Sequence, residues 1–140
     1  MTKTKIELLT VNQVIAINKL IVEQENQKHL CADSRKVESA VHAALYPGSY
    51  PFQHGGIACV AGALCYFLTK AHAFFDGNKR TAGIVAVTFM DINGYSLQYP
   101  FDVKTGLNEF ADVIEQVATN EISKDKLIEW FDIHKFHDGK

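Results

Sequence analysis

Two long stretches of this sequence are apolar around almost their whole circumference when they are placed on a helix. They are residues 57–71 (IACVAGALCYFLTKA) and residues 82–92 (AGIVAVTFMDI). A helix without a polar face is stable only when other elements surround it. Both runs are too long for buried strands of a parallel sheet, and no alternation of strands and helices accompanies them. We therefore expect an all-α fold built around a central buried helix pair.

Helical periodicity recurs on both sides of this pair. A capping box at Thr10 and Gln13 begins a first helix, and Asp33 and Ser34 are good N-cap candidates for a second one. Beyond the pair, a short extended piece precedes a one-sided helix whose apolar positions are Val103, Leu107, Phe110, Ile114 and Val117. Ser123 begins a last helix. The sequence thus predicts a single domain over residues 1–140, with about six helices and little or no sheet.

A loop rich in proline, glycine and aromatic residues separates the second helix from the central pair. Residues 46–56 read YPGSYPFQHGG, and this composition predicts a turn-rich loop or a short hairpin. Loops with exposed aromatic side chains are common contact surfaces. From these residues alone, Tyr50 and Phe52 are equally compatible with packing on the core.

Composition and charge restrict the class of protein. Fourteen Lys and Arg against sixteen Asp and Glu give a formal net charge of −2 over 140 residues, which argues against broad electrostatic binding to nucleic acid or to an anionic membrane. No apolar run approaches the roughly 18 residues that span a bilayer, and the first residues contain no signal-peptide core. The three cysteines lack metal-type spacing and suit reduced thiols. We expect a cytoplasmic protein.

The connector between the two central helices, HAFFDGNKRT (residues 72–81), concentrates polar side chains where an ordinary turn would suffice for folding. His72 can act as the general base for a hydroxyl nucleophile. Asp76 can supply a hard oxygen ligand to Mg²⁺. Taken singly, a histidine at a helix end is more often a cap and an aspartate more often a turn residue.

The four residues that follow suit the binding of phosphates. Gly77 permits a close backbone approach, and a helix that starts near Asn78 directs its free N–H groups and its positive dipole end into the loop. Lys79 and Arg80 lie at the end of the helix where cations are unfavourable, which a bound polyanion such as a phosphate chain would explain. Each cation alone is more often part of a solvated patch, so the argument depends on the combination.

The order of these residues resembles the signature of the Fic/Doc superfamily. Members share a His, a Phe two positions on, an acidic residue, and a Gly/Ala-Asn-Gly/Lys-Arg run. A longer stretch of this chain is similar to the Doc-like (death-on-curing) toxin branch, namely FLTKAHAFFDGNKRTAGIVAVTFMDINGY. The resemblance implies an all-α fold whose loop binds ATP, with His72 as the base, Asp76 as the Mg²⁺ ligand, and Gly77, Asn78, Lys79 and Arg80 as the phosphate cradle. It also implies a flap that aligns the target segment, for which Tyr50, Phe52 and Gln53 are the closest match.

Two departures favour the Doc-like branch. Adenylyltransferases of the family have Gly where this chain has Lys79, and a second Arg where it has Gly83. In the Doc-like branch this variant goes with an inverted nucleotide, so the implied reaction is transfer of the γ-phosphate of ATP to a Ser or Thr hydroxyl of a protein. The implied target is a translation factor such as elongation factor Tu, whose modification blocks translation. The alternatives are AMP transfer and a family member that binds a nucleotide or a partner without catalysis.

The family's inhibitory Ser/Thr-x-x-x-Glu-Gly/Asn pattern has no clean match, because the closest segment, which starts at Ser34 and reaches Glu38, continues with Ser39. The resemblance therefore implies a separate antitoxin polypeptide as the partner that holds the toxin inactive.

Overall fold

The structure is a computed structural model that describes residues 6–26, 33–45 and 55–138. Within these ranges it contains six helices and four short strands. The helices are α1 (Val11–Gln24), α2 (Ser34–Leu45), α3 (Ile57–Ala71), α4 (Asn78–Ile92), α5 (Glu109–Ala118) and α6 (Lys124–His134). The strands are β1 (Tyr95–Leu97), β2 (Phe101–Asp102), β3 (Leu107–Asn108) and β4 (Lys135–His137). The prediction of an all-α fold with about six helices is confirmed.

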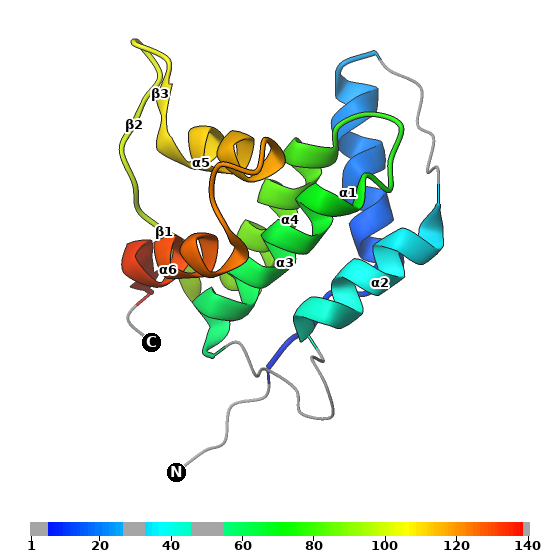
Figure 1. The fold of residues 1–140 in the computed structure, drawn as a ribbon, viewed down its shortest axis with the longest axis horizontal. Helices are drawn as coiled ribbons and strands as arrows, with labels where there is room; N and C mark the ends of the chain where they lie inside the picture. Colours follow the sequence, from blue (N-terminus) through cyan, green and yellow to red (C-terminus); the bar gives the residue numbers. More distant parts are fainter. Residues whose placement is uncertain (1–5, 27–32, 46–54, 139–140) are drawn as a thin grey trace.

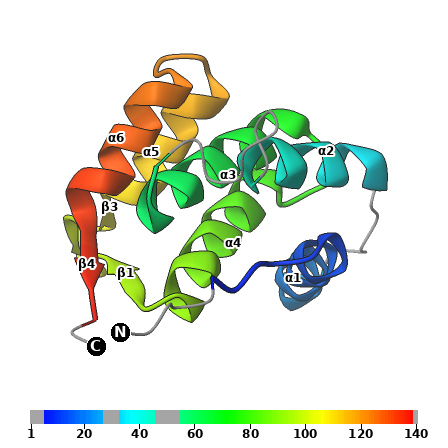
Figure 2. The same cartoon turned by 90° about the horizontal axis from the view of Figure 1, so that it is seen from below.

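The apolar helices α3 and α4 lie in the middle of the bundle, as their composition predicts. Figures 1 and 2 show α1 and α2 on one side of this pair and α5 and α6 on the other. The helix α3 packs against α2, α4, α5 and α6. The approach of α3 to α6 is close at Gly62, where an added Cβ would lie 2.9 Å from the Cα of Ile128. A glycine at this position therefore lets the two helix backbones pack directly.

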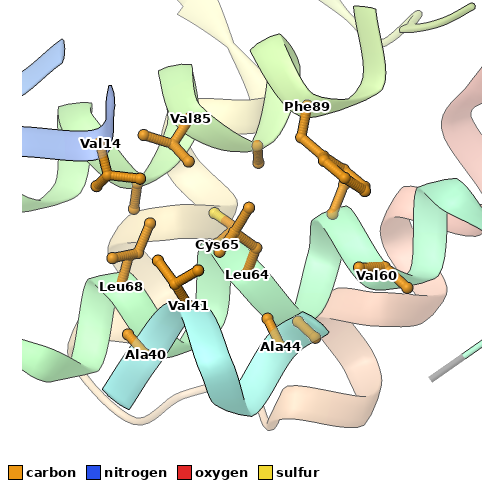
Figure 3. Packing of buried hydrophobic residues seen from close by; sticks show 14 of the residues in the cluster. Val14, Ala40, Val41, Ala44, Val60, Leu64, Cys65, Leu68, Val85 and Phe89 are labelled. Carbon is orange, nitrogen blue, oxygen red and sulfur yellow. The ribbon is translucent and has the colours of Figure 1, made fainter. Parts of the chain in front are cut away.

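The core extends through all six helices, and one part of it lies where α1, α2, α3 and α4 meet. Figure 3 shows side chains from all four helices pointing toward one another, among them Val14, Val41, Leu64 and Phe89. Val14 and Phe89 are fully buried, and Leu64 is nearly so. Burial of such side chains contributes about 1.5–3 kcal/mol each. This core fixes the ends of α3 and α4, and therefore the connector between them.

The prediction of a helix that already includes Val103 and Leu107 is wrong. The structure places these residues in an antiparallel hairpin, in which Phe101 pairs with Asn108 and Asp102 with Leu107. Val103 is 80% exposed and Leu107 is 46% exposed, so their helical spacing does not correspond to a buried face. Gly106, with φ of +81°, makes the turn. The helix α5 starts only at Glu109. Its N-cap is Asn108, whose side chain accepts a hydrogen bond from the Ala111 N–H.

A second pair of strands joins the chain that follows α4 to the end of α6. The strands β1 and β4 are antiparallel, with Ser96 opposite Phe136. This pairing connects the C-terminal part of the described chain to the central pair. None of the helices in the described ranges combines the length and the hydropathy that a bilayer crossing requires.

Candidate active site

The connector between α3 and α4 contains two residues in the left-handed backbone conformation, which residues other than glycine rarely adopt. His72 ends α3 with φ of +50° and ψ of +45°, and Gly77 precedes α4 with φ of +77°. The left-handed conformation costs a residue with a Cβ about 1–2 kcal/mol. Strain of this kind is concentrated at functional sites, where the surrounding structure compensates for it. His72 is exposed, so its imidazole remains accessible to a substrate.

The side chain of Asn78 fixes the shape of the loop. Its Oδ1 accepts a hydrogen bond from the Phe74 N–H at 3.0 Å, and its Nδ2 donates to the Phe74 carbonyl at 2.9 Å. The Phe74 ring is 5% exposed and anchors the loop in the core. With both ends of its amide engaged, Asn78 can offer a ligand its backbone N–H at the first position of α4. Its place in the phosphate cradle remains a prediction, and it now concerns the backbone N–H of Asn78 and not its side chain.

Asn18 is a supporting residue that the sequence analysis missed. It is 1% exposed, and its Nδ2 donates to the Asp76 carbonyl and to the Thr81 Oγ1, both at 2.9 Å. These bonds tie the loop and the first turn of α4 to α1. The spacing of the sequence could have indicated this role. Asn18 shares a face of α1 with Val14 and Ile21, which makes it a polar residue at a core position.

Asp76 presents a carboxylate beside the N-terminus of α4. Its Oδ1 accepts a hydrogen bond from the Gly77 N–H at 2.8 Å. Within the described ranges its other carboxylate oxygen has no protein partner, and the residue is exposed. A Mg²⁺ ion keeps several waters and takes one or two carboxylates together with substrate phosphates. A single accessible carboxylate next to the N-terminus of a helix, which favours anions, is compatible with such an ion.

Both cations of the connector are paired with glutamates. Lys79 Nζ lies 2.6 Å from Glu115 Oε1 of α5, and Arg80 forms an ion pair with Glu25 at the end of α1. All four side chains are about half exposed. Exposed ion pairs contribute about 0–1 kcal/mol. A phosphate chain can therefore compete with these carboxylates for the two cations.

A single pocket of about 740 Å³ brings the residues of the connector together with α4 and α5. Sites for small molecules have volumes of about 300–1,000 Å³. The pocket is lined by all six residues that the sequence predicts as the base, the metal ligand and the phosphate cradle, which are His72, Asp76, Gly77, Asn78, Lys79 and Arg80. The lining residues are Thr69, His72, Phe75, Asp76, Gly77, Asn78, Lys79, Arg80, Gly83, Ile84, Val87, Thr88, Tyr99, Asn108, Phe110, Ala111, Ile114, Glu115 and Ala118.

The position of Gly83 has a structural explanation in this pocket. A Cβ added to Gly83 would lie 3.0 Å from Ile114 Cδ1 and 3.5 Å from Phe110 Cε2. A side chain here would require the end of the Ile114 side chain to shift by a few tenths of an ångström. The absence of an arginine at residue 83 therefore agrees with the local packing of α4 against α5.

Outside the connector, the described cysteine and metal-ligating side chains form no second site. The predicted flap residues Tyr50, Phe52 and Gln53 lie outside the described residues. Burial raises the pKa of the Cys65 thiol to about 12, and burial also raises the pKa of Cys59. These thiols are poor nucleophiles at neutral pH. Across residues 6–26, 33–45 and 55–138, no group of three or more His, Cys, Asp or Glu side chains is placed to hold a metal ion.

Comparison with known proteins agrees with the sequence motif. A family model described as Fic/DOC family matches residues 8–90, which include the whole connector. A curated protein named Toxin Doc, from Mycolicibacterium smegmatis (strain ATCC 700084 / mc(2)155), is 42% identical over 67 residues. That alignment covers 48% of this chain and 48% of the relative. The match thus spans about half the length of that relative.

Proposed function

The chain belongs to the Fic/DOC family, and we propose that it is a Doc-like toxin that transfers the γ-phosphate of ATP to a Ser or Thr hydroxyl of a protein. The observation that carries the proposal is the gathering of His72, Asp76 and residues 77–80 at one end of one pocket. The likeness to Toxin Doc, which reaches 42% identity, supports the toxin assignment. The expected target is a translation factor, with elongation factor Tu as the first candidate, and the expected location is the cytoplasm.

In the proposed reaction His72 prepares the nucleophile. The unprotonated imidazole accepts the proton of the target hydroxyl as its oxygen attacks the γ-phosphorus. The new O–P bond forms while the bond from the γ-phosphorus to the β,γ-bridging oxygen breaks, and ADP leaves. His72 is suited to this role because it is exposed and its backbone is fixed by the strained end of α3.

The other residues of the connector stabilise the triphosphate. The free N–H groups of the first turn of α4 and the dipole of this helix attract phosphate oxygens. Lys79 and Arg80 leave Glu115 and Glu25 and hold the charge that develops during transfer. Asp76 would hold Mg²⁺, which when bound neutralises charge on the phosphates.

The same residues favour γ-phosphate transfer over AMP transfer. Lys79 fills space that a glycine would leave open and adds a charge beside the phosphates. Gly83 cannot be replaced by the second arginine of an adenylyltransferase without displacing Ile114. These two positions are the ones in which the motif departs from that of adenylyltransferases.

Paired labelling tests the proposal. The purified protein is incubated with a bacterial translation extract and ATP labelled at either the α- or the γ-phosphate. We expect label from γ-labelled ATP alone to enter a protein of the extract, and mass spectrometry to place a phosphate on a Ser or Thr. His72→Ala should abolish transfer, whereas His137→Ala, which replaces an exposed histidine outside the pocket, should retain it. Incorporation of the α-label would show AMP transfer. ATP binding without any incorporation would show a non-catalytic member.

The proposal includes a partner. Because the chain is similar to a protein named Toxin Doc, and because the family's inhibitory pattern has no clean match in this sequence, we expect a separate antitoxin polypeptide to bind this domain and prevent the reaction. Co-expression of a candidate antitoxin should relieve the growth inhibition caused by this protein, and the two polypeptides should co-purify.

A further inference from the structure

Two adjacent phenylalanines of the connector have opposite environments. Phe74 is 5% exposed and belongs to the hydrophobic core, whereas Phe75 is 75% exposed. Among the phenylalanines that the structure describes, Phe75 is the most exposed. Because Phe74 already anchors the connector in the core, folding gives no reason for a second aromatic side chain at residue 75.

The backbone is fixed on both sides of Phe75. The N–H of Phe74 donates to Asn78 Oδ1 at 3.0 Å, and the Phe74 carbonyl accepts from Asn78 Nδ2 at 2.9 Å. On the other side, the Asp76 carbonyl accepts from Asn18 Nδ2 at 2.9 Å. The exposed ring therefore projects from a loop that is already ordered, so a partner that binds it does not have to order the loop first.

Phe75 also lies beside the proposed general base. Phe75 and His72 line the same pocket, in the connector that Figure 1 shows at one end of the central helix pair. Because they are three positions apart, their Cα atoms are separated by at most about 11 Å. An extended peptide advances about 3.3 Å per residue. A protein segment whose hydroxyl reaches His72 can therefore place a side chain on Phe75 from within three residues of that hydroxyl.

The phosphate donor does not account for an aromatic ring at this place. The proposed site of the triphosphate is the N-terminus of α4, which follows the connector directly. Phosphates are charged and offer no apolar surface to a phenyl ring, whereas aromatic side chains are enriched at protein–protein interfaces. The exposed ring of Phe75 thus fits the protein substrate better than the phosphates.

We propose that Phe75 is a substrate-specificity residue, which contacts an apolar side chain of the target protein within three residues of the modified Ser or Thr. This inference rests on the proposed phosphate transfer. The contact forms when the target binds, because both apolar side chains then leave water. It is present both before and during the transfer of the phosphate, so its loss should raise the KM for the target and leave kcat unchanged.

Labelling at a series of target concentrations tests the contact. The purified protein is incubated with Mg²⁺, saturating γ-labelled ATP and dilutions of a bacterial translation extract from which nucleotides have been removed. We expect Phe75→Ala to raise the extract concentration for half-maximal labelling about 5- to 20-fold, as for other well-placed interface residues. The maximal rate should stay within about twofold of the wild type. Phe75→Leu, which keeps an apolar side chain, should stay within about threefold of the wild type in both quantities.

A matched variant and two further measurements control this result. Phe136→Ala truncates a 49% exposed phenylalanine outside the pocket and should not change the labelling. Calorimetric titration with Mg²⁺ and a non-hydrolysable ATP analogue should give the same affinity for the wild type and Phe75→Ala. Mass spectrometry of the labelled protein should find a large apolar residue within three positions of the phosphorylated one.

The outcomes separate this inference from the proposed function. An unchanged extract dependence of Phe75→Ala, or a phosphorylated residue with only small or polar neighbours within three positions, would refute the contact and leave phosphate transfer standing. Weaker binding of the ATP analogue with an unchanged extract dependence would make Phe75 a nucleotide contact and would also overturn the inference. Absence of γ-label with the wild-type protein would overturn the phosphate transfer, and the contact with it.

Discussion

Replacing Asn18 by leucine should separate the stability of the protein from the activity of its pocket. Asn18 is 1% exposed and makes two hydrogen bonds of 2.9 Å, to the Asp76 carbonyl and to Thr81. Its own Oδ1 is buried without a partner in the described residues. A leucine has a similar shape, removes both bonds and also removes that unsatisfied oxygen.

The magnitude follows from these contacts. Two neutral hydrogen bonds contribute about 2 kcal/mol together, while removal of a buried unsatisfied acceptor returns about 1–3 kcal/mol. Thr81, which is 1% exposed, also loses its donor, and a buried group left without a partner costs about 1–3 kcal/mol. The free energy of unfolding should therefore fall by less than about 3 kcal/mol. The loop, however, loses its tie to α1, and misplacement of a catalytic group by about 1 Å lowers the rate roughly 100-fold. We expect phosphate transfer to fall about 10- to 100-fold.

Urea unfolding followed by circular dichroism measures the first quantity, and transfer of γ-label measures the second. Leu20→Ala, which truncates a 64% exposed residue of the same helix, is the control and should change neither. Full activity of Asn18→Leu would refute the assignment of Asn18 as a positioning residue. A loss of stability above about 3 kcal/mol would show that Asn18 serves the fold instead.

Three further predictions concern the pocket and the core. His72→Ala should lower transfer at least 100-fold without weakening ATP binding in calorimetry, and weaker binding would mean that the imidazole mainly holds the nucleotide. Glu115→Gln should free Lys79 and strengthen tripolyphosphate binding about two- to fivefold at low salt; weaker binding would show that Glu115 assists the site. Burial raises the pKa of Cys65 from 9.0 to about 12, so the folded state retains a proton that the unfolded chain loses, and stability should fall as pH rises from about 9 to 12. Cys65→Ala should make this decline less steep by up to about 1.4 kcal/mol per pH unit, as measured by urea unfolding at several pH values, and an unchanged slope would contradict the assignment.

The central helices and their connector could be predicted because their signals are local. The apolar circumference of α3 and α4 has no stable alternative outside a bundle. Gly77, with φ of +77°, marks the start of α4 by its turn conformation. The identity of the polar residues between the helices then pointed to phosphate chemistry before any contact was known.

What escaped prediction depends on contacts between distant parts of the chain. Val103 and Leu107 continue the apolar spacing of α5, but the turn at Gly106 pairs β2 with β3 and leaves both exposed. The glutamates that pair with Lys79 and Arg80 come from α5 and from the end of α1, and nothing near them in the sequence indicates this. The buried position of Asn18 was visible in its spacing, yet its partners were not.

The most direct measurement is a crystal structure of His72→Ala bound to Mg²⁺ and a non-hydrolysable ATP analogue. We predict that the terminal phosphate lies beside residue 72 at the start of α4. An analogue with its α-phosphate beside residue 72, or one bound outside this pocket, would contradict the account.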